Sequence, residues 1–360
     1  MSGNYGWGGR DRAADYDPPA RDNTGFSRAY KPYDNGPSPD AFSKADANKS
    51  KAVPMSRAVG GKAASVAVHN VDLSAKKHIE TTKKNVIILS MDRTGSMGDW
   101  RHEIFQRLAL LFKESEKLLG ESLEIIFTGF GDLAYGDTFE VAPPGSGPEL
   151  DQFLLALDKH ENGGGNMIES SEMPAYYVAH NVDTTSARSV FYFTITDEGF
   201  YPFIKEGDVD ATLGLRGGGE DSAKILRDLK VRANVFTILA MTGTANSTIQ
   251  RQWKGAIGEE NVIELDDARR VVDVLLGIIA KLAGQFDQFS KALDARQLGT
   301  QFGKVNVKTV QDALSKVIGA PGTPSVKAGT KSLIVSADPA ANPATAASPA
   351  PTPGGTKSLL

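Results

Sequence analysis

The sequence contains no cysteine in its 360 residues. Disulfide bonds and thiolate metal ligands are therefore excluded, which fits a reducing compartment such as the cytoplasm. No run of eighteen apolar residues occurs, so no segment has the pattern of a membrane-spanning helix. The first residues, MSGNYGWGGRDRAADYD, lack the apolar core of a signal peptide. We therefore expect a cytoplasmic protein with no membrane partner.

Excess charge of either sign is also missing. The formal net charge is −4, with 40 basic and 44 acidic side chains, so the composition gives no reason to expect binding to nucleic acid. Apolar residues make up 40% of the chain, which is enough for a substantial core. The length exceeds that of an ordinary domain, which favours one large domain with irregular flanks.

Both ends of the chain lack periodic apolar patterns. Residues 1–70 are rich in Gly, Pro, Asp, Asn and Ser with isolated aromatic side chains, which predicts a flexible leader or an arm that docks on a partner. Residues 321–360 form an Ala/Pro/Thr-rich tail that we expect to be disordered. Within it GTKSLI at 329–334 recurs as GTKSLL at 355–360. The repeat is either a duplicated binding motif that raises avidity or a chance duplication in a biased segment.

Between these ends, apolar segments of strand type alternate with amphipathic segments of helix type. The alternation predicts an α/β fold with a doubly wound, mostly parallel central sheet flanked by helices. Ligands of such sheets bind beyond the carboxyl ends of the strands. The predicted strands cover 85–90, 123–132, 137–143 (a possible antiparallel edge), 189–199, 233–241 and 261–266, and the predicted helices cover 104–119, 148–160, 170–182, 222–230, 248–258 and 268–286.

Oxygen-bearing side chains follow the predicted strands at that edge. Asp92, Thr94 and Ser96 alternate directly after the first strand, Asn166 lies in the glycine-rich loop NGGGNMIESSE, and Asp197 ends a later strand. Two carboxylates, two hydroxyls and an amide are suitable ligands for Mg²⁺, which prefers octahedral oxygen coordination. No cysteine or paired histidine accompanies them, which argues against zinc.

Taken in order, D-x-T-x-S, G-G-G-x-x-x-E-S and T-D resemble the motifs of the von Willebrand factor A (integrin I-like) family, over roughly residues 84–284. Residues 285–320 would be a helical extension. The resemblance implies a metal-ion-dependent adhesion site for Mg²⁺, with Mn²⁺ or Ca²⁺ as substitutes. In it Asp92 would act largely through water, Thr94 and Ser96 would bind the ion directly, and Asp197 would close the shell. Asn166 stands where the family usually has Thr or Asp, so Glu169 is an alternative ligand.

The resemblance also implies a mechanism. An Asp or Glu side chain of a protein partner would fill an open coordination position on the ion. The helix ending near Lys281–Gln285 would be the movable element. We therefore expect a metal-dependent protein-binding module that acts as an intracellular adaptor or scaffold, and an AAA+ ATPase or another component of a multiprotein assembly is a candidate partner.

Several alternatives remain open from sequence. The chain could be a Mg²⁺-dependent phosphoester hydrolase, a metal-free scaffold of the same family, or a phage virion-associated protein. Enzyme motifs are incomplete, however. Thr94 stands where a haloacid dehalogenase-type phosphatase needs a second Asp, VGGKAAS at 59–65 is not a P-loop, and TGSMG at 94–98 lacks the spacing of a nucleophile elbow. We expect no enzymatic activity.

Ordinary structural roles compete for some of these residues. Asp92 could cap the helix that begins near Trp100, and Asp132 is expected to be a turn residue. The segment GGGED at 217–221 is expected to form a turn and cap the following helix. Met91 and Met97 are expected to be packing or rim residues.

Overall fold

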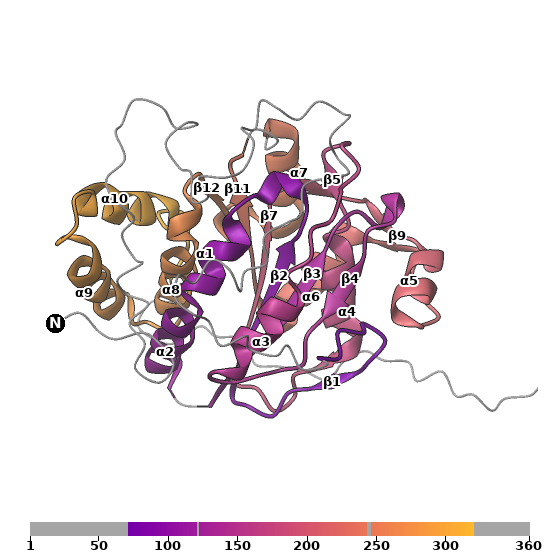
Figure 1. Cartoon of the computed structure of the whole chain (residues 1–360), viewed down its shortest axis with the longest axis horizontal. Helices are drawn as coiled ribbons and strands as arrows, with labels where there is room; N and C mark the ends of the chain where they lie inside the picture. Colours follow the sequence, from indigo (N-terminus) through magenta and orange to yellow (C-terminus); the bar gives the residue numbers. More distant parts are fainter. Residues whose placement is uncertain (1–70, 121, 243–245, 320–360) are drawn as a thin grey trace, which may run out of the picture.

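The computed structural model describes residues 71–120, 122–242 and 246–319, so the predicted leader and the whole predicted tail with its repeat lie outside the described residues. A six-stranded sheet forms the centre, in the order β12-β11-β7-β2-β3-β4 (Figure 1). Its strands are β2 (Asn85–Asp92), β3 (Leu123–Phe130), β4 (Phe139–Val141), β7 (Ser189–Thr196), β11 (Asn234–Ala240) and β12 (Val262–Leu265). In the described ranges, no helix is long and apolar enough to cross a membrane.

The middle strands are apolar on both faces because helices cover both faces of the sheet. Every residue of β2, β3, β7 and β11 is buried. All neighbouring strands of this sheet are parallel except β3 and β4, which are antiparallel. The prediction of an α/β fold with a mostly parallel sheet is confirmed, as is the antiparallel edge strand at 137–143.

Two layers of helices sandwich the sheet (Figure 1). One apolar cluster joins the sheet to α1 (Trp100–Gln106), α2 (Leu108–Leu119), α3 (Glu149–Ala156), α8 (Val271–Leu282), α9 (Phe286–Gln297) and α10 (Gly303–Ala313). The other joins it to α4 (Glu172–Asn181), α5 (Glu206–Leu213), α6 (Ser222–Arg232) and α7 (Ser247–Ile257). Short strands lie at β1 (Ile79–Glu80), β5 (Ile168–Glu169), β6 (Val182–Asp183), β8 (Gly199–Phe200), β9 (Phe203–Ile204) and β10 (Glu220–Asp221).

Most predicted helices form with shifted ends, and one prediction is wrong. The predicted helix 104–119 is two helices, α1 and α2, that meet at Arg107, whose φ and ψ of −114° and 15° leave the helical region. Helix α5 was not predicted, because Glu206–Leu213 buries only Val209 and Leu213 and so shows little apolar periodicity.

Helices α9 and α10 pack on the outer side of α8 (Figure 1). Gly277 of α8 permits close approach, because a Cβ there would lie 2.2 Å from Leu314 Cδ1. Asp273 Oδ1 accepts a hydrogen bond from Arg296 at 3.1 Å. Lys281 Nζ donates to the carbonyl of Leu314 at 2.7 Å. The last two helices are thus fastened to α8 at three levels along its length.

The order of the strands places a topological switch point between β2 and β7, where ligand crevices form in such sheets. The chain leaves β2 toward β3 on one side, whereas it leaves β7 toward β11 on the other. The two crossovers diverge at the carboxyl ends of β2 and β7, which is where doubly wound sheets bind ligands.

Candidate metal centre

Asp92 ends β2 at this switch point and is fully buried. Its Oδ1 accepts hydrogen bonds from the Thr94 backbone N–H at 2.8 Å and the Thr94 hydroxyl at 2.7 Å. Its Oδ2 accepts one from the Thr196 hydroxyl of β7 at 2.8 Å. Burial raises the pKa of Asp92 to about 6, against the opposing effect of these bonds. The carboxylate bonds to its own loop and to β7, so it is not a cap of α1.

The sequence after Asp92 turns sharply. Gly95–Met97 form a 3₁₀ turn, which ends at Gly98 with φ +46°, a value that suits glycine. Buried Met97 anchors the turn, while Ser96 is exposed. The Ser96 and Thr94 hydroxyl oxygens lie 3.2 Å apart. The turn therefore places two hydroxyls side by side, one buried and one open to solvent.

Asp197 follows β7 and completes the arrangement. Ser96 Oγ donates to Asp197 Oδ1 at 3.0 Å, and the Thr242 hydroxyl, just after β11, donates to Asp197 Oδ2. An unbroken series of contacts thus runs from Asp92 through Thr94 and Ser96 to Asp197. We call Asp92 and Asp197 the hydroxyl-linked pair.

Two further carboxyl groups lie beside this pair. Glu169 and Glu198 are buried, and one oxygen of each, Oε2, has no hydrogen-bond partner among the described residues. Burial, followed by repulsion from Asp92, raises the pKa of Glu169 to about 10. Burial, followed by repulsion from Asp197, raises the pKa of Glu198 to about 7. Burying carboxyl oxygens without partners costs free energy. These groups are therefore stabilised either by binding protons or by a nearby cation.

Asn166 is held elsewhere. Its Nδ2 donates to the Tyr201 hydroxyl at 3.1 Å, and its Oδ1 accepts from the Ile168 backbone N–H at 3.1 Å. The structure does not bring it into the series from Asp92 to Asp197, so its role as a ligand stays a prediction. Glu169 and Thr94 both lie beside Gly163, since a Cβ added there would be 2.8 Å from Glu169 Oε1 and 3.4 Å from Thr94 Cγ2.

A second set of acids lies along the same edge and is bonded mainly to backbone N–H groups. Asp137 accepts bonds from the backbone N–H groups of residues 132, 162 and 163, and Glu172 accepts one from Tyr201 N–H. Asp132 accepts from Ala134 N–H and from the Tyr201 hydroxyl. We call Asp132, Asp137 and Glu172 the amide-bound group. Asp132 caps a short 3₁₀ helix at Leu133–Tyr135, which agrees with the expected turn role.

Buried Arg93, directly after Asp92, forms ion pairs with two neighbouring segments. Its guanidinium pairs with Glu140 at 2.6 Å and with Glu161 at 2.8 Å. A Cβ at Gly129 would lie 2.6 Å from Arg93 Cδ, so glycine makes room for this side chain in β3. Two carboxylates outside the hydroxyl-linked pair therefore already neutralise this positive charge.

Sequence reasoning included Thr196 only as part of the T-D motif, without a role of its own, and missed Thr242. Both are threonines at the carboxyl ends of strands, where they read as ordinary β-sheet residues. The signal that could have found them is their position, since Thr196 ends β7 and Thr242 follows β11. The expected roles of Met91 and Met97 as packing residues are confirmed by burial, and Asp221 caps α6 through Lys224 N–H, as expected of GGGED.

The residues present suit a hard divalent cation. In the part of the chain that the structure describes, no three His, Asp or Glu side chains are grouped as ligands of one ion. The candidate set instead mixes two carboxylates with two hydroxyls. Such oxygen donors suit Mg²⁺ or Ca²⁺, and the two orphaned carboxyl oxygens nearby leave negative charge for a cation to neutralise.

Comparison with known proteins gives similarity of fold. No protein-family model matches the sequence, and no curated protein matches it. Among solved structures, the pilus adhesin SpaC from Lactobacillus rhamnosus GG aligns over 57% of this chain and 31% of its own, with 16% identity and a TM-score of 0.40. A mutant of the PilB minor pilin from Streptococcus sanguinis aligns over 57% and 62%, with 10% identity and a TM-score of 0.37.

A von Willebrand factor type A protein from Catenulispora acidiphila aligns over 59% of this chain and 51% of its own, with 12% identity and a TM-score of 0.33. This chain thus covers about a third of the adhesin and less than two thirds of the other two. The similarity concerns the fold, and function is argued from the residues of this chain.

Proposed function

We propose that this protein is a divalent-cation-dependent protein-binding module of the von Willebrand factor A type. The observation that carries the proposal is the series of contacts from Asp92 through Thr94 and Ser96 to Asp197, with Ser96 open to solvent. Thr94 and Ser96 would hold Mg²⁺ directly, and Asp92 and Asp197 would hold it directly or through water. A bound cation would supply positive charge and an open coordination position for a carboxylate.

The remaining groups of the site act on the ligands. The Thr196 and Thr242 hydroxyls orient the two carboxylates, as outer-shell groups do in metal sites. Glu169 and Glu198 add negative charge when ionised, and with Asn166 they complete the candidate donors. The partner would present an Asp or Glu side chain to the exposed face at Ser96. An adaptor or scaffold role in the cytoplasm, with an AAA+ ATPase as one candidate partner, follows as part of this proposal.

Metal titration tests the first half of the proposal. Calorimetric titration of the full chain with Mg²⁺ and Mn²⁺ should give one site, and Asp92→Ala should abolish it. Asp210→Ala, which removes an exposed carboxylate on α5, is the matched control and should titrate like the wild type. Absence of metal binding by the wild type would leave a metal-free scaffold instead.

Partner capture tests the second half. Proteins recovered on the immobilised full chain in Mg²⁺ should be lost in EDTA and on the Asp92→Ala variant. Recovery that is equal in all three conditions would contradict a metal-dependent interaction. Turnover of generic phosphoesters that depends on both Mg²⁺ and Asp92 would favour the hydrolase alternative.

A further inference from the structure

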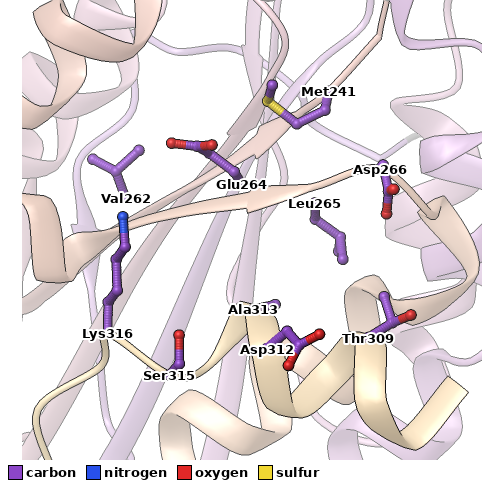
Figure 2. Close-up of a pocket in the computed structure, with 10 residues that line it drawn as sticks. All are labelled: Met241, Val262, Glu264, Leu265, Asp266, Thr309, Asp312, Ala313, Ser315 and Lys316. Carbon is purple, nitrogen blue, oxygen red and sulfur yellow. The ribbon is translucent and has the colours of Figure 1, made fainter. Parts of the chain in front are cut away.

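A half-open cleft of about 510 Å³ lies between β12 and α10 (Figure 2). β12 is the outermost strand of the six-stranded sheet, bonded to β11 on one side. The far wall consists of α10 and the turn after it, including Thr309, Asp312 and Ser315. The cleft therefore runs along an open edge of the sheet, a surface able to accept an added extended segment.

The cleft combines apolar and acidic surface. Met241 and Ala313, both half-buried, contribute apolar area, and Glu264, Asp266 and Asp312 contribute carboxylates. Lys316 is its single basic lining residue. The chemistry fits an extended peptide that carries a basic side chain next to aliphatic ones.

Asp266 is the acid most available to such a ligand. Glu264 pairs with Lys254 at 2.6 Å, and Asp312 pairs with Lys308. The exposed Asp266 carboxylate has no ion pair or hydrogen bond among the described residues. An incoming cation would therefore find Asp266 without displacing another partner.

We propose that the segment GTKSLI at 329–334 of the same chain docks in this cleft along the edge of β12. It places Lys331 beside Leu333 and Ile334, which is the combination of charge and aliphatic surface that the cleft offers. Lys316 itself lines the cleft, and the described chain ends three residues later at Gly319. Lys331 lies fifteen positions after Lys316, a span of up to about 50 Å when extended, so the segment can reach back to the cleft.

The first copy of the repeat is favoured over the second because its linker to the cleft is shorter. Effective concentration falls with linker length, and 355–360 lies 26 positions further along the chain than 329–334. Docking covers the free edge of β12 and is independent of any metal, so it can be tested in EDTA.

The absence of cysteine in the wild-type chain permits a direct test by disulfide trapping in the full chain. Ser332→Cys is combined with Thr309→Cys, which lines the cleft, or with Gln311→Cys, an exposed position on α10 outside the lining. We expect the 309 pair to form an intramolecular disulfide at least about tenfold faster than the 311 pair, at a rate independent of protein concentration. Ser315→Cys provides a second lining position should the 309 variant fold poorly.

A charge swap tests the recognition itself. Lys331→Glu should slow the 309–332 disulfide at least about fivefold through repulsion from the cleft acids, and Asp266→Lys should restore it in that background. The proposal would be overturned if the disulfide formed equally fast at positions 309 and 311, or if disulfide-linked dimers predominated. It would also be overturned if Ser358→Cys formed the disulfide as fast as Ser332→Cys.

Discussion

The hydroxyl-linked pair and the amide-bound group are both buried acids at the carboxyl edge of one sheet, yet their partners differ in kind. Asp137 of the amide-bound group accepts three backbone N–H bonds, which are fixed by the fold. Asp92 and Asp197 are bonded mainly by hydroxyls. A hydroxyl can rotate its hydrogen away and present a lone pair, whereas an amide N–H cannot. The type of hydrogen-bond donor thus distinguishes acids that hold loops in place from acids whose neighbours could also bind a cation.

The largest expected effect separates the two sets by stability. Asp137→Ala leaves three backbone N–H groups without their acceptor, so the free energy of unfolding should fall by about 3 kcal/mol or more, at about 1 kcal/mol or more per group. Urea denaturation in EDTA measures this. Metal stabilisation of the variant should persist; its complete loss would show that Asp137 belongs functionally to the hydroxyl-linked pair.

Adding metal should stabilise the protein by an amount that depends on the affinity of the site for the ion. At a Mg²⁺ concentration 100 times the dissociation constant, the free energy of unfolding should rise by about 2.7 kcal/mol. Asp197→Asn should remove most of this gain, while Asp132→Asn should keep it. Thermal unfolding with Mg²⁺, Mn²⁺, Ca²⁺ and EDTA provides the measurement, and an equal response of the two variants would erase the distinction.

The amide-bound group should also give a pH signature. Burial raises the pKa of Glu172 to about 8, from 4.5. The native state therefore binds a proton that the unfolded state releases, so this contribution is complete below pH 4.5 and is lost as pH rises through 8. Glu172→Gln should remove a decline in stability of about 2–3 kcal/mol between pH 5 and 7. Parallel denaturation curves in EDTA at several pH values would detect it, and identical slopes would contradict the assignment.

The smallest change concerns one hydroxyl. Thr94→Ser keeps the oxygen and should bind metal within a few-fold of the wild type, whereas Thr94→Val should bind about 10- to 100-fold more weakly. Stability in EDTA should change by only about 1 kcal/mol in Thr94→Val, the value of one hydrogen bond. Calorimetry compares the affinities, and equal affinity in both variants would exclude Thr94 as a ligand.

The fold could be predicted because its strands are buried on both faces and therefore read as continuous apolar runs, as in β2 and β7. Asp92, Thr94, Ser96 and Asp197 could be selected because strand ends of a parallel sheet converge at one edge. Asn166 could not be placed, because the conformation of its glycine-rich loop depends on contacts with Tyr201 that are distant in sequence. The break at Arg107 likewise depends on tertiary packing, since the apolar pattern runs through it.

The attachment of α9 and α10 to α8 has a mechanical consequence. From the family resemblance, the helix ending near Lys281–Gln285, here α8, is predicted to be the movable element. In this protein Gly277, Asp273 and Lys281 couple α8 to its two neighbours. Because of these attachments, an axial shift of α8 would also move α10 and so change the width of the cleft beside β12.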